Sequence, residues 1–192
     1  YLVHSGQTLF KGMIYSDVRR VQLDIETLGL SPERPENEIF LIAISDSRGF
    51  ETLLEGPEKR ILEDLVELVR ELDPDVIEGH NILGFDLPYI TRRAEINEVS
   101  LPLGRDGSVI TVGQEQNTAI GGTSRPIIPF DIYGRHVVDT LIGVQRYDVA
   151  RGVLSSHGLK ECARTLGVAC PDRVEIQHDQ IAGVWRSDPE RV

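Results

Sequence analysis

The chain has 192 residues, of which 40% are hydrophobic and 27% are charged, the composition of an ordinary globular protein. Its net charge of −11 argues against a protein that binds nucleic acid on its own through a broad basic surface, because Lys and Arg provide that affinity. An enzyme whose carboxylates hold divalent cations is not excluded, since the bound cations return positive charge.

Three strands are predicted in the first third of the chain, after a lead-in of residues 1–19 that has no clear helical period. Residues 21–25 alternate between apolar and polar side chains, and residues 39–44 form the continuous apolar run of a strand buried on both faces. Residues 50–54 follow a turn that contains Gly. Because the connections are short, the three strands can form a meander.

A helix, a short strand and a second helix follow. Pro57 stands at the first turn of a helix whose apolar residues recur three and four positions apart, and Asp73-Pro74 ends it. Val76-Ile77 is predicted to form a short strand. After a turn, the apolar pattern predicts a helix over residues 87–96.

The next region interrupts this regular order. Residues 100–133 are rich in Gly, Pro, Ser and Thr and have a weak period, which predicts an insertion that contains a hairpin. Residues 136–138 are predicted to form a strand that leads into a helix from about Thr140.

Two more helices are predicted near the C-terminus. Ser155 or Ser156 is expected to cap the first of them, and Gly167 to end it. Residues 176–185 form the second. The order of elements predicts an α/β protein with a mixed central sheet flanked by helices.

Cysteine content and hydropathy indicate the setting of the protein. Cys162 and Cys170 form no CxxC pair and no zinc-finger spacing, which fits a reduced, cytoplasmic location. No run of about 18 apolar residues occurs, so we expect no association with a membrane. Because the first residue is Tyr1 rather than Met, we expect a processed product or a piece of a larger protein.

Two acidic residues stand on one face of the first predicted strand. Asp24 and Glu26 are two positions apart, so their side chains point to the same side of the sheet. Neighbouring carboxylates repel each other and are costly to desolvate, and a divalent cation removes both problems. Oxygen ligands favour Mg²⁺ or Mn²⁺. The alternative is a strand end whose acids simply reach solvent.

A second candidate segment covers residues 79–90 and leads from a predicted strand into a helix. Asp86 is expected near the helix start, where an acidic side chain is favourable. Asn81 and two glycines allow the loop to approach a ligand closely, and Phe85 can offer an aromatic face to a base. The alternative is an ordinary helix start with Asp86 as N-cap and Phe85 in the core.

Two further residues allow two interpretations each. His80 is either a catalytic base or a loop histidine that bonds to the backbone, and the second is favoured. Asp139 follows the strand at 136–138, on the same side of the sheet as the proposed site. It is either an acid that supports the site or the cap of the following helix, and the cap is favoured.

Taken together, these segments resemble a known family. Asp-Ile-Glu-Thr at 24–27 and Gly-His-Asn-Ile-x-x-Phe-Asp at 79–86 resemble the first two motifs of the DEDD exonucleases, in the form found in family B DNA polymerases. Residues 134–139 and 159–163 resemble the segment between the second and third motifs. The resemblance extends from about Arg20 to the end of the chain and is weakest in the predicted insertion.

The resemblance implies a ribonuclease H-like fold and a metal-dependent 3′→5′ exonuclease that hydrolyses terminal phosphodiester bonds of DNA. It implies two divalent ions, Mg²⁺ or Mn²⁺, as cofactors. Asp24 would bridge the two ions, Glu26 would bind one and help to orient the attacking water, and Asp86 would hold the other. Thr27, Asn81 and Phe85 would contact the single-stranded 3′ end. A polymerase domain in the same or a partner chain is the implied context.

One motif of the family is missing. The third motif, Tyr-x-x-x-Asp, carries the fourth metal-binding acid, and no such spacing occurs in the 192 residues. We therefore expect the chain to stop short of it. Two alternatives stay open: a catalytically inactive ribonuclease H-like module that binds nucleic acid or serves as a scaffold, and an RNA-directed or structure-selective nuclease of the same superfamily.

Overall fold

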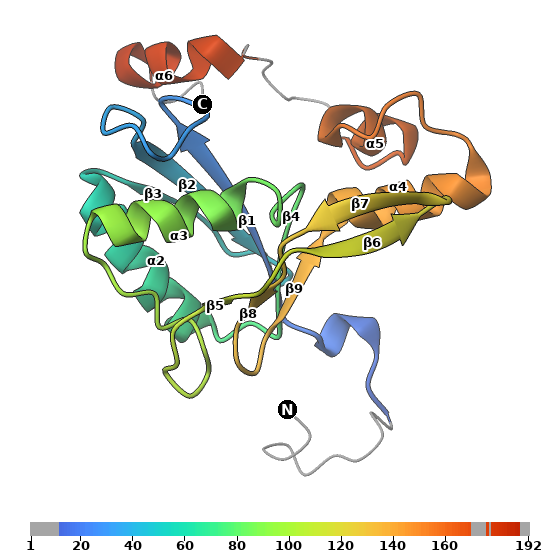
Figure 1. Ribbon diagram of the computed structural model, residues 1–192, viewed down its shortest axis with the longest axis horizontal. Helices are drawn as coiled ribbons and strands as arrows, with labels where there is room; N and C mark the ends of the chain where they lie inside the picture. The colour runs from blue at the N-terminus through green and yellow to red at the C-terminus, as the bar shows by residue number, and fades with distance from the viewer. Residues whose placement is uncertain (1–11, 170–175, 177, 189–192) are drawn as a thin grey trace.

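A central sheet with the strand order β3-β2-β1-β4-β9 organises the molecule (Figure 1). The structure is a computed structural model that describes residues 12–169, 176 and 178–188. The sheet strands are β1 (Arg20–Thr27), β2 (Ile39–Asp46), β3 (Glu51–Glu55), β4 (Val76–Gly79) and β9 (His136–Asp139). Strands β1, β2 and β3 are antiparallel neighbours, whereas β4 and β9 run parallel to β1. The predicted meander and the predicted mixed sheet are both confirmed.

Two helices cover one face of this sheet. Helix α2 (Glu58–Leu72) begins after Pro57 and ends at Asp73, which has a left-handed backbone with φ 42°. Helix α3 (Asp86–Ile96) lies beside it (Figure 1). Their apolar stripes pack onto the inward side chains of β1, β2 and β4, and the fully buried members include Ile42, Ile61, Leu62, Leu65, Ile77, Leu87 and Ile90. Each such side chain contributes about 1.5–3 kcal/mol by leaving water, so this layer supplies the main core.

The remaining helices lie at the edge and on the other side of the sheet. Helix α4 (Thr140–Arg151) follows β9 directly, and α5 (Leu159–Thr165) comes next in the chain. Helix α6 (His178–Ser187), which confirms the helix predicted over 176–185, brings Trp185 to 6.5 Å from Phe40 of β2 between ring centroids. Among the described residues, none of the helices combines the length and apolarity needed to cross a membrane.

The cap predicted for α5 is wrong. Gly158 occupies the N-cap position, and neither Ser155 nor Ser156 caps the helix. The Ser156 hydroxyl instead accepts a hydrogen bond from the Gly158 amide, and the Ser155 hydroxyl donates to Glu161. Serine side chains compete for nearby backbone and side-chain partners, and here those local bonds fix the turn before the helix. Cys162 is the buried residue of α5.

The predicted insertion contains a hairpin that projects beside α4 (Figure 1). It is formed by β6 (Gln116–Ile120) and β7 (Thr123–Ile127). Gly121 and Gly122 join the two strands with φ of +59° and +79°. A two-residue turn with positive φ at both positions matches the twist of paired strands, and glycine adopts it without strain. Strands β5 (Thr111–Val112) and β8 (Phe130–Asp131) form a second small sheet.

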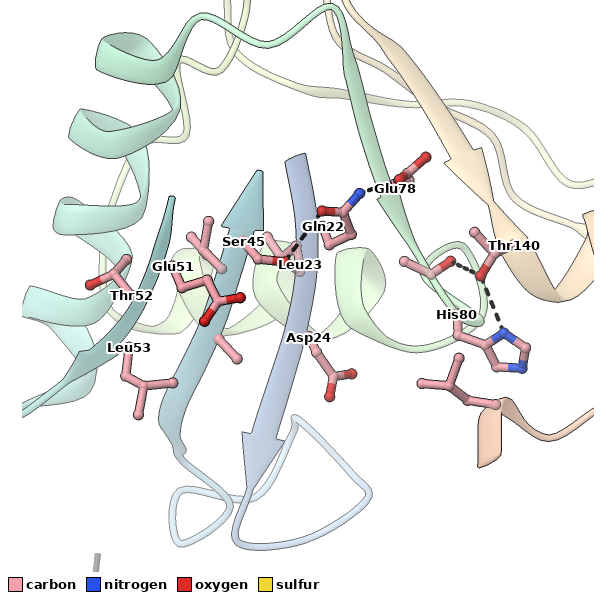
Figure 2. Close-up of a pocket in the computed structure, with 14 residues that line it drawn as sticks. Gln22, Leu23, Asp24, Ser45, Glu51, Thr52, Leu53, Glu78, His80 and Thr140 are labelled. Carbon is pink, nitrogen blue, oxygen red and sulfur yellow. Dashed lines mark hydrogen bonds between the residues drawn. The ribbon is translucent and has the colours of Figure 1, made fainter. Parts of the chain in front are cut away.

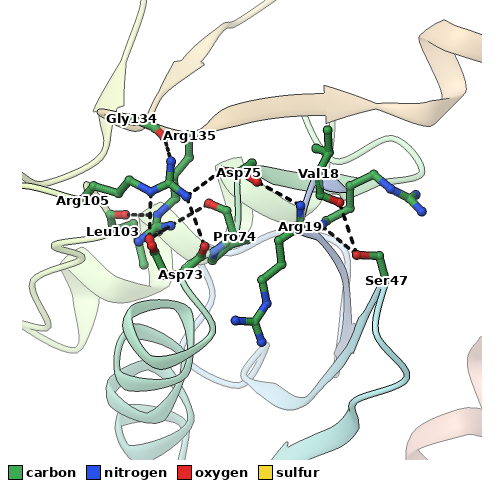
Figure 3. A network of polar contacts seen from close by, with 11 residues as sticks. Val18, Arg19, Ser47, Asp73, Pro74, Asp75, Leu103, Arg105, Gly134 and Arg135 are labelled. Carbon is green, nitrogen blue, oxygen red and sulfur yellow. Dashed lines mark hydrogen bonds and ion pairs between the residues drawn. The ribbon is translucent and has the colours of Figure 1, made fainter. Parts of the chain in front are cut away.

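At the N-terminal ends of the parallel strands, arginines and aspartates form a paired network (Figure 3). Asp73 accepts hydrogen bonds from Arg105 at 2.8 Å and from Arg135 at 2.7 Å. Arg105 also bonds to Asp75, which in turn accepts from the Arg19 amide. The network joins the end of α2 to the starts of β1, β4 and β9. Residues 12–19 before β1 include a short 3-10 helix, η1 (Tyr15–Asp17), and the rest of the predicted lead-in, 1–11, lies outside the described residues.

Candidate active site

Strand β1 presents its two acidic residues on the face opposite to α2 and α3. Leu23 and Ile25, which alternate with them, are 4% and 5% exposed in the core. Asp24 is exposed and Glu26 is half-buried. The pairing of β1 with β2 shifts its register between Glu26 and Thr27. Such a bulge bends the strand and changes the direction of its last side chains.

Strands β1 and β4 separate just before these acids. Their pairing extends only as far as Gln22 opposite Glu78. Gly79 then approaches β1 so closely that a Cβ there would stand 2.8 Å from the Leu23 carbonyl oxygen. A side chain at this position would push the strands apart, which explains the glycine. Beyond it, the edge of β1 is open to groups from the loop and from α3.

Asp86 fills this opening at the first position of α3. Its Oδ1 accepts a hydrogen bond of 3.2 Å from the amide of Ile25, the residue between Asp24 and Glu26. The three predicted metal-binding acids are thereby brought to one region of the molecule. Phe85, rather than Asp86, occupies the N-cap position of α3.

The protonation of Asp86 reflects its surroundings. Asp86 is 3% exposed, and this burial together with the negative charge of Asp24 raises its pKa from 3.8 to about 7. Asp139 adds a smaller effect in the same direction, while the Ile25 amide opposes it. A carboxyl group with such a pKa keeps its proton near neutral pH unless a cation replaces it. Perturbed acids of this kind cluster at functional sites.

The loop of residues 79–85 carries the predicted substrate contacts. Asn81 is exposed and has a φ of 74°, a left-handed conformation that Asn tolerates better than most residues. A Cβ at Gly84 would overlap the Asn81 Oδ1, so a larger residue there would displace the Asn81 side chain. Phe85 is half-buried, with its ring centroid 5.3 Å from that of Tyr89.

Asp139 is the N-cap of α4, as favoured from the sequence, and it also contacts the loop. Its Oδ1 accepts from the amides of Leu141 at 2.9 Å and Asn81 at 3.1 Å. Its Oδ2 accepts from the amide of Leu83 at 3.2 Å. The favoured interpretation as a helix cap is confirmed, and the same carboxylate also bonds to the loop.

His80 bonds to the backbone, which confirms the favoured interpretation. Its Nε2 lies 2.8 Å from the carbonyl oxygen of His157, and its Nδ1 lies 3.2 Å from the Thr140 hydroxyl. Because a carbonyl oxygen only accepts, Nε2 carries a proton and donates it. His80 therefore connects the 79–85 loop to the segment before α5.

A second loop, residues 28–38, follows β1 and borders the site. The Thr27 hydroxyl donates to the Gly29 carbonyl at 3.0 Å, and Thr27 is only 7% exposed. The Tyr89 hydroxyl lies 2.7 Å from the same carbonyl and 2.9 Å from that of Asn37. Sequence reasoning missed Tyr89, and its place in the second motif, three residues after Asp86, was the only signal that could have drawn attention to it.

A cavity of about 530 Å³ opens on the face that carries Asp24 (Figure 2). Its acidic lining residues are Asp24, Glu51 and Glu78, and none of the described residues that line it is Lys or Arg. His80 lies at the end of the cavity near Thr140. The acidic side chains among the described lining residues disfavour a phosphate group, and bound cations would offset this repulsion.

The donor chemistry fits Mg²⁺ or Mn²⁺. Asp24, Glu26 and Asp86 offer hard carboxylate oxygens, and a divalent cation would offset the burial and the Asp24 charge that raise the pKa of Asp86. Within residues 12–169, 176 and 178–188, no three His, Cys, Asp or Glu side chains are gathered closely enough to hold an ion as they stand. The acids share a region, and a cation would have to draw them together.

The sheet order, the acids on β1 and the acid at the start of α3 define a ribonuclease H-like domain of the exonuclease type. Residues 21–162 match the family described as the exonuclease domain of family B DNA polymerases. The match covers well over half of the chain, and the chain belongs to this family. The resemblance recognised from the two motifs is thereby confirmed.

Similar proteins agree with this assignment. A DNA polymerase from Archaeoglobus fulgidus is 29% identical over 185 residues, which is 94% of this chain and 21% of that protein. The DNA polymerase delta catalytic subunit of Caenorhabditis elegans is 36% identical over 141 residues, or 69% of this chain and 12% of that protein. The family B DNA polymerase of Pyrobaculum calidifontis superposes with a TM-score of 0.68 at 27% identity, covering 91% of this chain. The chain spans 22% or less of each of these relatives.

Proposed function

We propose that the chain is a metal-dependent 3′→5′ exonuclease domain that removes nucleotides from the single-stranded 3′ end of DNA. Asp24, Glu26 and Asp86 are the catalytic, metal-binding residues in this proposal. The cofactors are two divalent ions, Mg²⁺ or Mn²⁺, which would stabilise the charge on the attacking and leaving oxygens of the scissile phosphodiester.

One observation carries the proposal. The carboxylate of Asp86 is bonded to the backbone amide between Asp24 and Glu26, and its pKa is raised to about 7 by burial and by Asp24. A purely structural acid in a buried position is normally paired with a cation or a set of donors that lowers its pKa. A buried acid whose proton affinity is raised by burial and by a neighbouring carboxylate is suited to a site that a divalent cation completes.

The chain's own residues have separate tasks around this centre. Asp24 and Glu26 face the same side of the sheet and supply ligands from a rigid strand. Asp86 must release its proton before it can act as a ligand, so it couples cation binding to pH. The acidic cavity beside Asp24 keeps a phosphodiester away until cations are bound.

The 79–85 loop holds the strand end in this proposal. Asn81 is exposed and provides an amide side chain for hydrogen bonds to the nucleotide. Phe85 keeps part of its ring accessible for stacking on a base. Thr27 is buried and bonded to Gly29, so we assign it the support of the 28–38 loop beside the strand.

We further propose that the domain works beside a polymerase domain in the same or a partner chain. The relatives named as DNA polymerases are several times longer than the region that this chain matches. A net charge of −11 gives weak affinity for DNA, and a neighbouring DNA-binding domain would supply a high effective concentration of the strand end. The fourth metal-binding acid, absent as a Tyr-x-x-x-Asp motif, is the ligand that this proposal leaves unassigned.

The test combines binding and cleavage. Mn²⁺ is titrated into the protein by calorimetry, and a 5′-labelled single strand is digested in parallel. Asp24→Ala should abolish both metal binding and stepwise shortening from the 3′ end. Glu63→Ala, which removes one exposed carboxylate from α2 on the opposite face, should leave both unchanged.

The outcomes separate the competing functions. Mn²⁺ binding that Asp24→Ala removes, with release of one nucleotide at a time, supports the exonuclease. Binding without cleavage points to an incomplete site and calls for the fourth acid. The absence of both binding and cleavage would favour the inactive scaffold. The missing third motif is the specific argument for that alternative. Equal digestion of an RNA strand would favour the RNA-directed alternative.

A further inference from the structure

We propose that Asp139 is a positioning residue whose carboxylate holds the 79–85 loop in the conformation that presents Asn81 and Phe85 to the strand end. The inference rests on the proposed function, because it assigns the origin of strand binding at that same site. Asp139 itself touches neither the strand nor the ions. It acts through the backbone of the loop, from the end of the neighbouring strand β9.

The two carboxylate oxygens of Asp139 have different partners. Oδ1 is shared by the helix and the loop, accepting from Leu141 at 2.9 Å and from Asn81 at 3.1 Å. Oδ2 accepts from the Leu83 amide at 3.2 Å, whereas the cap bond of the helix goes to Oδ1. A helix cap requires one acceptor oxygen, so the second oxygen is explained only by the loop. Asp139 is 8% exposed, which strengthens hydrogen bonds to its charge.

The loop conformation depends on these bonds. Asn81 has a φ of 74°, and its carbonyl accepts from the amides of Gly84 and Phe85, both at 2.9 Å. The Asn81 peptide is therefore fixed on its carbonyl side by the turn and on its amide side by Asp139. A left-handed residue persists only where its surroundings determine it. Without Asp139, two backbone amides would lose a charged acceptor, and the turn that orients Phe85 would loosen.

Strand order explains how a distant residue reaches this loop. Gly79, the last residue of β4, lies opposite Asp139, the last residue of the parallel strand β9. The carboxyl ends of the two strands meet at one edge of the sheet, where the loop begins. The sheet thus fixes the position of Asp139, and the hydrogen bonds of Asp139 restrain the loop.

Asp139→Asn separates the two roles. Asn caps helices about as well as Asp, so the oxygen shared by Leu141 and Asn81 can be retained. The second oxygen becomes an NH₂ group, which cannot accept from Leu83. The substitution also removes a negative charge that helps to raise the pKa of Asp86. Loss of that charge reduces the competition of the proton at Asp86 but also weakens the attraction for a divalent cation, so Mn²⁺ affinity is measured separately from strand binding.

The experiment uses the protein with Ca²⁺, which can occupy the proposed metal sites without supporting rapid cleavage. The probe is a fluorescent oligo-dT strand. Fluorescence anisotropy gives the Kd, calorimetry with Mn²⁺ gives metal binding, and NMR amide exchange reports single residues. In Asp139→Asn we expect about tenfold faster exchange at Leu83, unchanged exchange at Leu141, and about tenfold weaker strand binding, as for one lost bond to a charged acceptor. Mn²⁺ affinity should change by much less than strand affinity.

Two controls sharpen the result. Asp46 is a buried carboxylate that accepts from two backbone amides, of Arg48 at 2.8 Å and Phe50 at 2.9 Å, at the turn after β2. Asp46→Asn should therefore leave strand binding unchanged. In a double-mutant cycle, the losses from Asp139→Asn and Phe85→Ala should not add, because both act through the same stacking contact.

Two results would overturn the inference while leaving the exonuclease intact. The first is a wild-type protein that binds the strand and an Asp139→Asn variant that binds it equally well. The second is a loss of strand binding in Asp139→Asn that the fraction of unfolded protein accounts for completely. Wild-type protein that binds neither Mn²⁺ nor the strand would instead contradict the proposed function, and the inference with it.

Discussion

The two ends of the parallel strands β1, β4 and β9 carry acidic groups whose pKa values are shifted in opposite directions. At the N-terminal end, Asp73 is exposed, and hydrogen bonds from Arg105 and Arg135 outweigh its partial desolvation and hold its pKa below the ordinary value. At the C-terminal end, burial and the charge of Asp24 raise the pKa of Asp86 to about 7. One end lowers the proton affinity of its acid, and the other raises it.

The difference separates a structural cluster from a candidate site. Arginines at the N-terminal end satisfy carboxylates and backbone carbonyls, so the ion pairs join four elements and leave little for a ligand to change (Figure 3). At the C-terminal end, folding brings acidic side chains together at a cost in electrostatic free energy. Binding of a proton or a metal ion offsets that cost. The raised pKa of Asp86, more than the number of charged residues, distinguishes the candidate site from the structural cluster.

The largest expected effect is a pair of opposite stability changes. Asp86→Asn should stabilise the metal-free protein at pH 8 by on the order of 4 kcal/mol, because the shift from 3.8 to about 7 measures the cost of ionising the buried acid. Asp73→Asn should instead lower stability by up to about 1 kcal/mol, since Asp73 is largely exposed. Urea unfolding in EDTA measures both. Destabilisation in both variants would remove the contrast between the two ends.

A smaller loss is expected from the buried arginine of the structural end. The side chain of Arg135 is 3% exposed and donates to the carbonyls of Leu103 at 2.9 Å and Pro74 at 2.6 Å. Arg135→Met should lower the free energy of unfolding by about 3 kcal/mol, because those carbonyls lose their donors. Arg92→Met, at an exposed ion pair with Glu33, should cost less than about 1 kcal/mol. Equal losses in the two variants would show that burial of the network contributes nothing.

The effect that is smallest per step of the measurement is a gradual dependence on pH. Folded Asp86 binds its proton more tightly than the unfolded chain does, so metal-free stability should fall as pH rises from 3.8 to about 7. The slope reaches at most about 1.4 kcal/mol per pH unit, and the fall ends above the folded pKa. Subtracting the curve of Asp86→Asn isolates this group from the others. Mn²⁺ affinity should rise over the same range, and an affinity independent of pH would argue against Asp86 as a ligand.

Much of the fold was predictable from local pattern. The alternation at β1 and the continuous apolar run at β2 placed both strands, and the stripe from Ile61 to Leu72 placed α2. The two motif segments were enough to indicate the family, because a same-face pair of acids and an acid at a helix start are encoded within a few residues. The cap predicted for α5 was wrong, because Ser155 and Ser156 form other local hydrogen bonds.

Contacts between distant segments were not predictable. Glu58, which reads as an exposed acid in the first turn of α2, is 6% exposed and bonded to Arg93 at 2.7 Å and 2.6 Å. Tyr89 reaches two carbonyls of the 28–38 loop across about 50 to 60 positions of sequence. Asp139 reaches the 79–85 loop over a similar span. Such pairings depend on how the sheet and helices pack, and no periodic pattern in one sequence specifies them.

The hydrogen bond from the Ile25 amide to Asp86 has a consequence for how this site tolerates mutation. The bond that joins the third acid to the first two is made by the main chain, so it does not depend on which side chain stands at position 25. Substitution of Ile25 by another β-branched or apolar residue would alter packing, but the bond from its amide to Asp86 would remain. Proline alone lacks the amide, and Ile25→Pro would remove the bond between β1 and Asp86 of α3 without replacing an acidic residue.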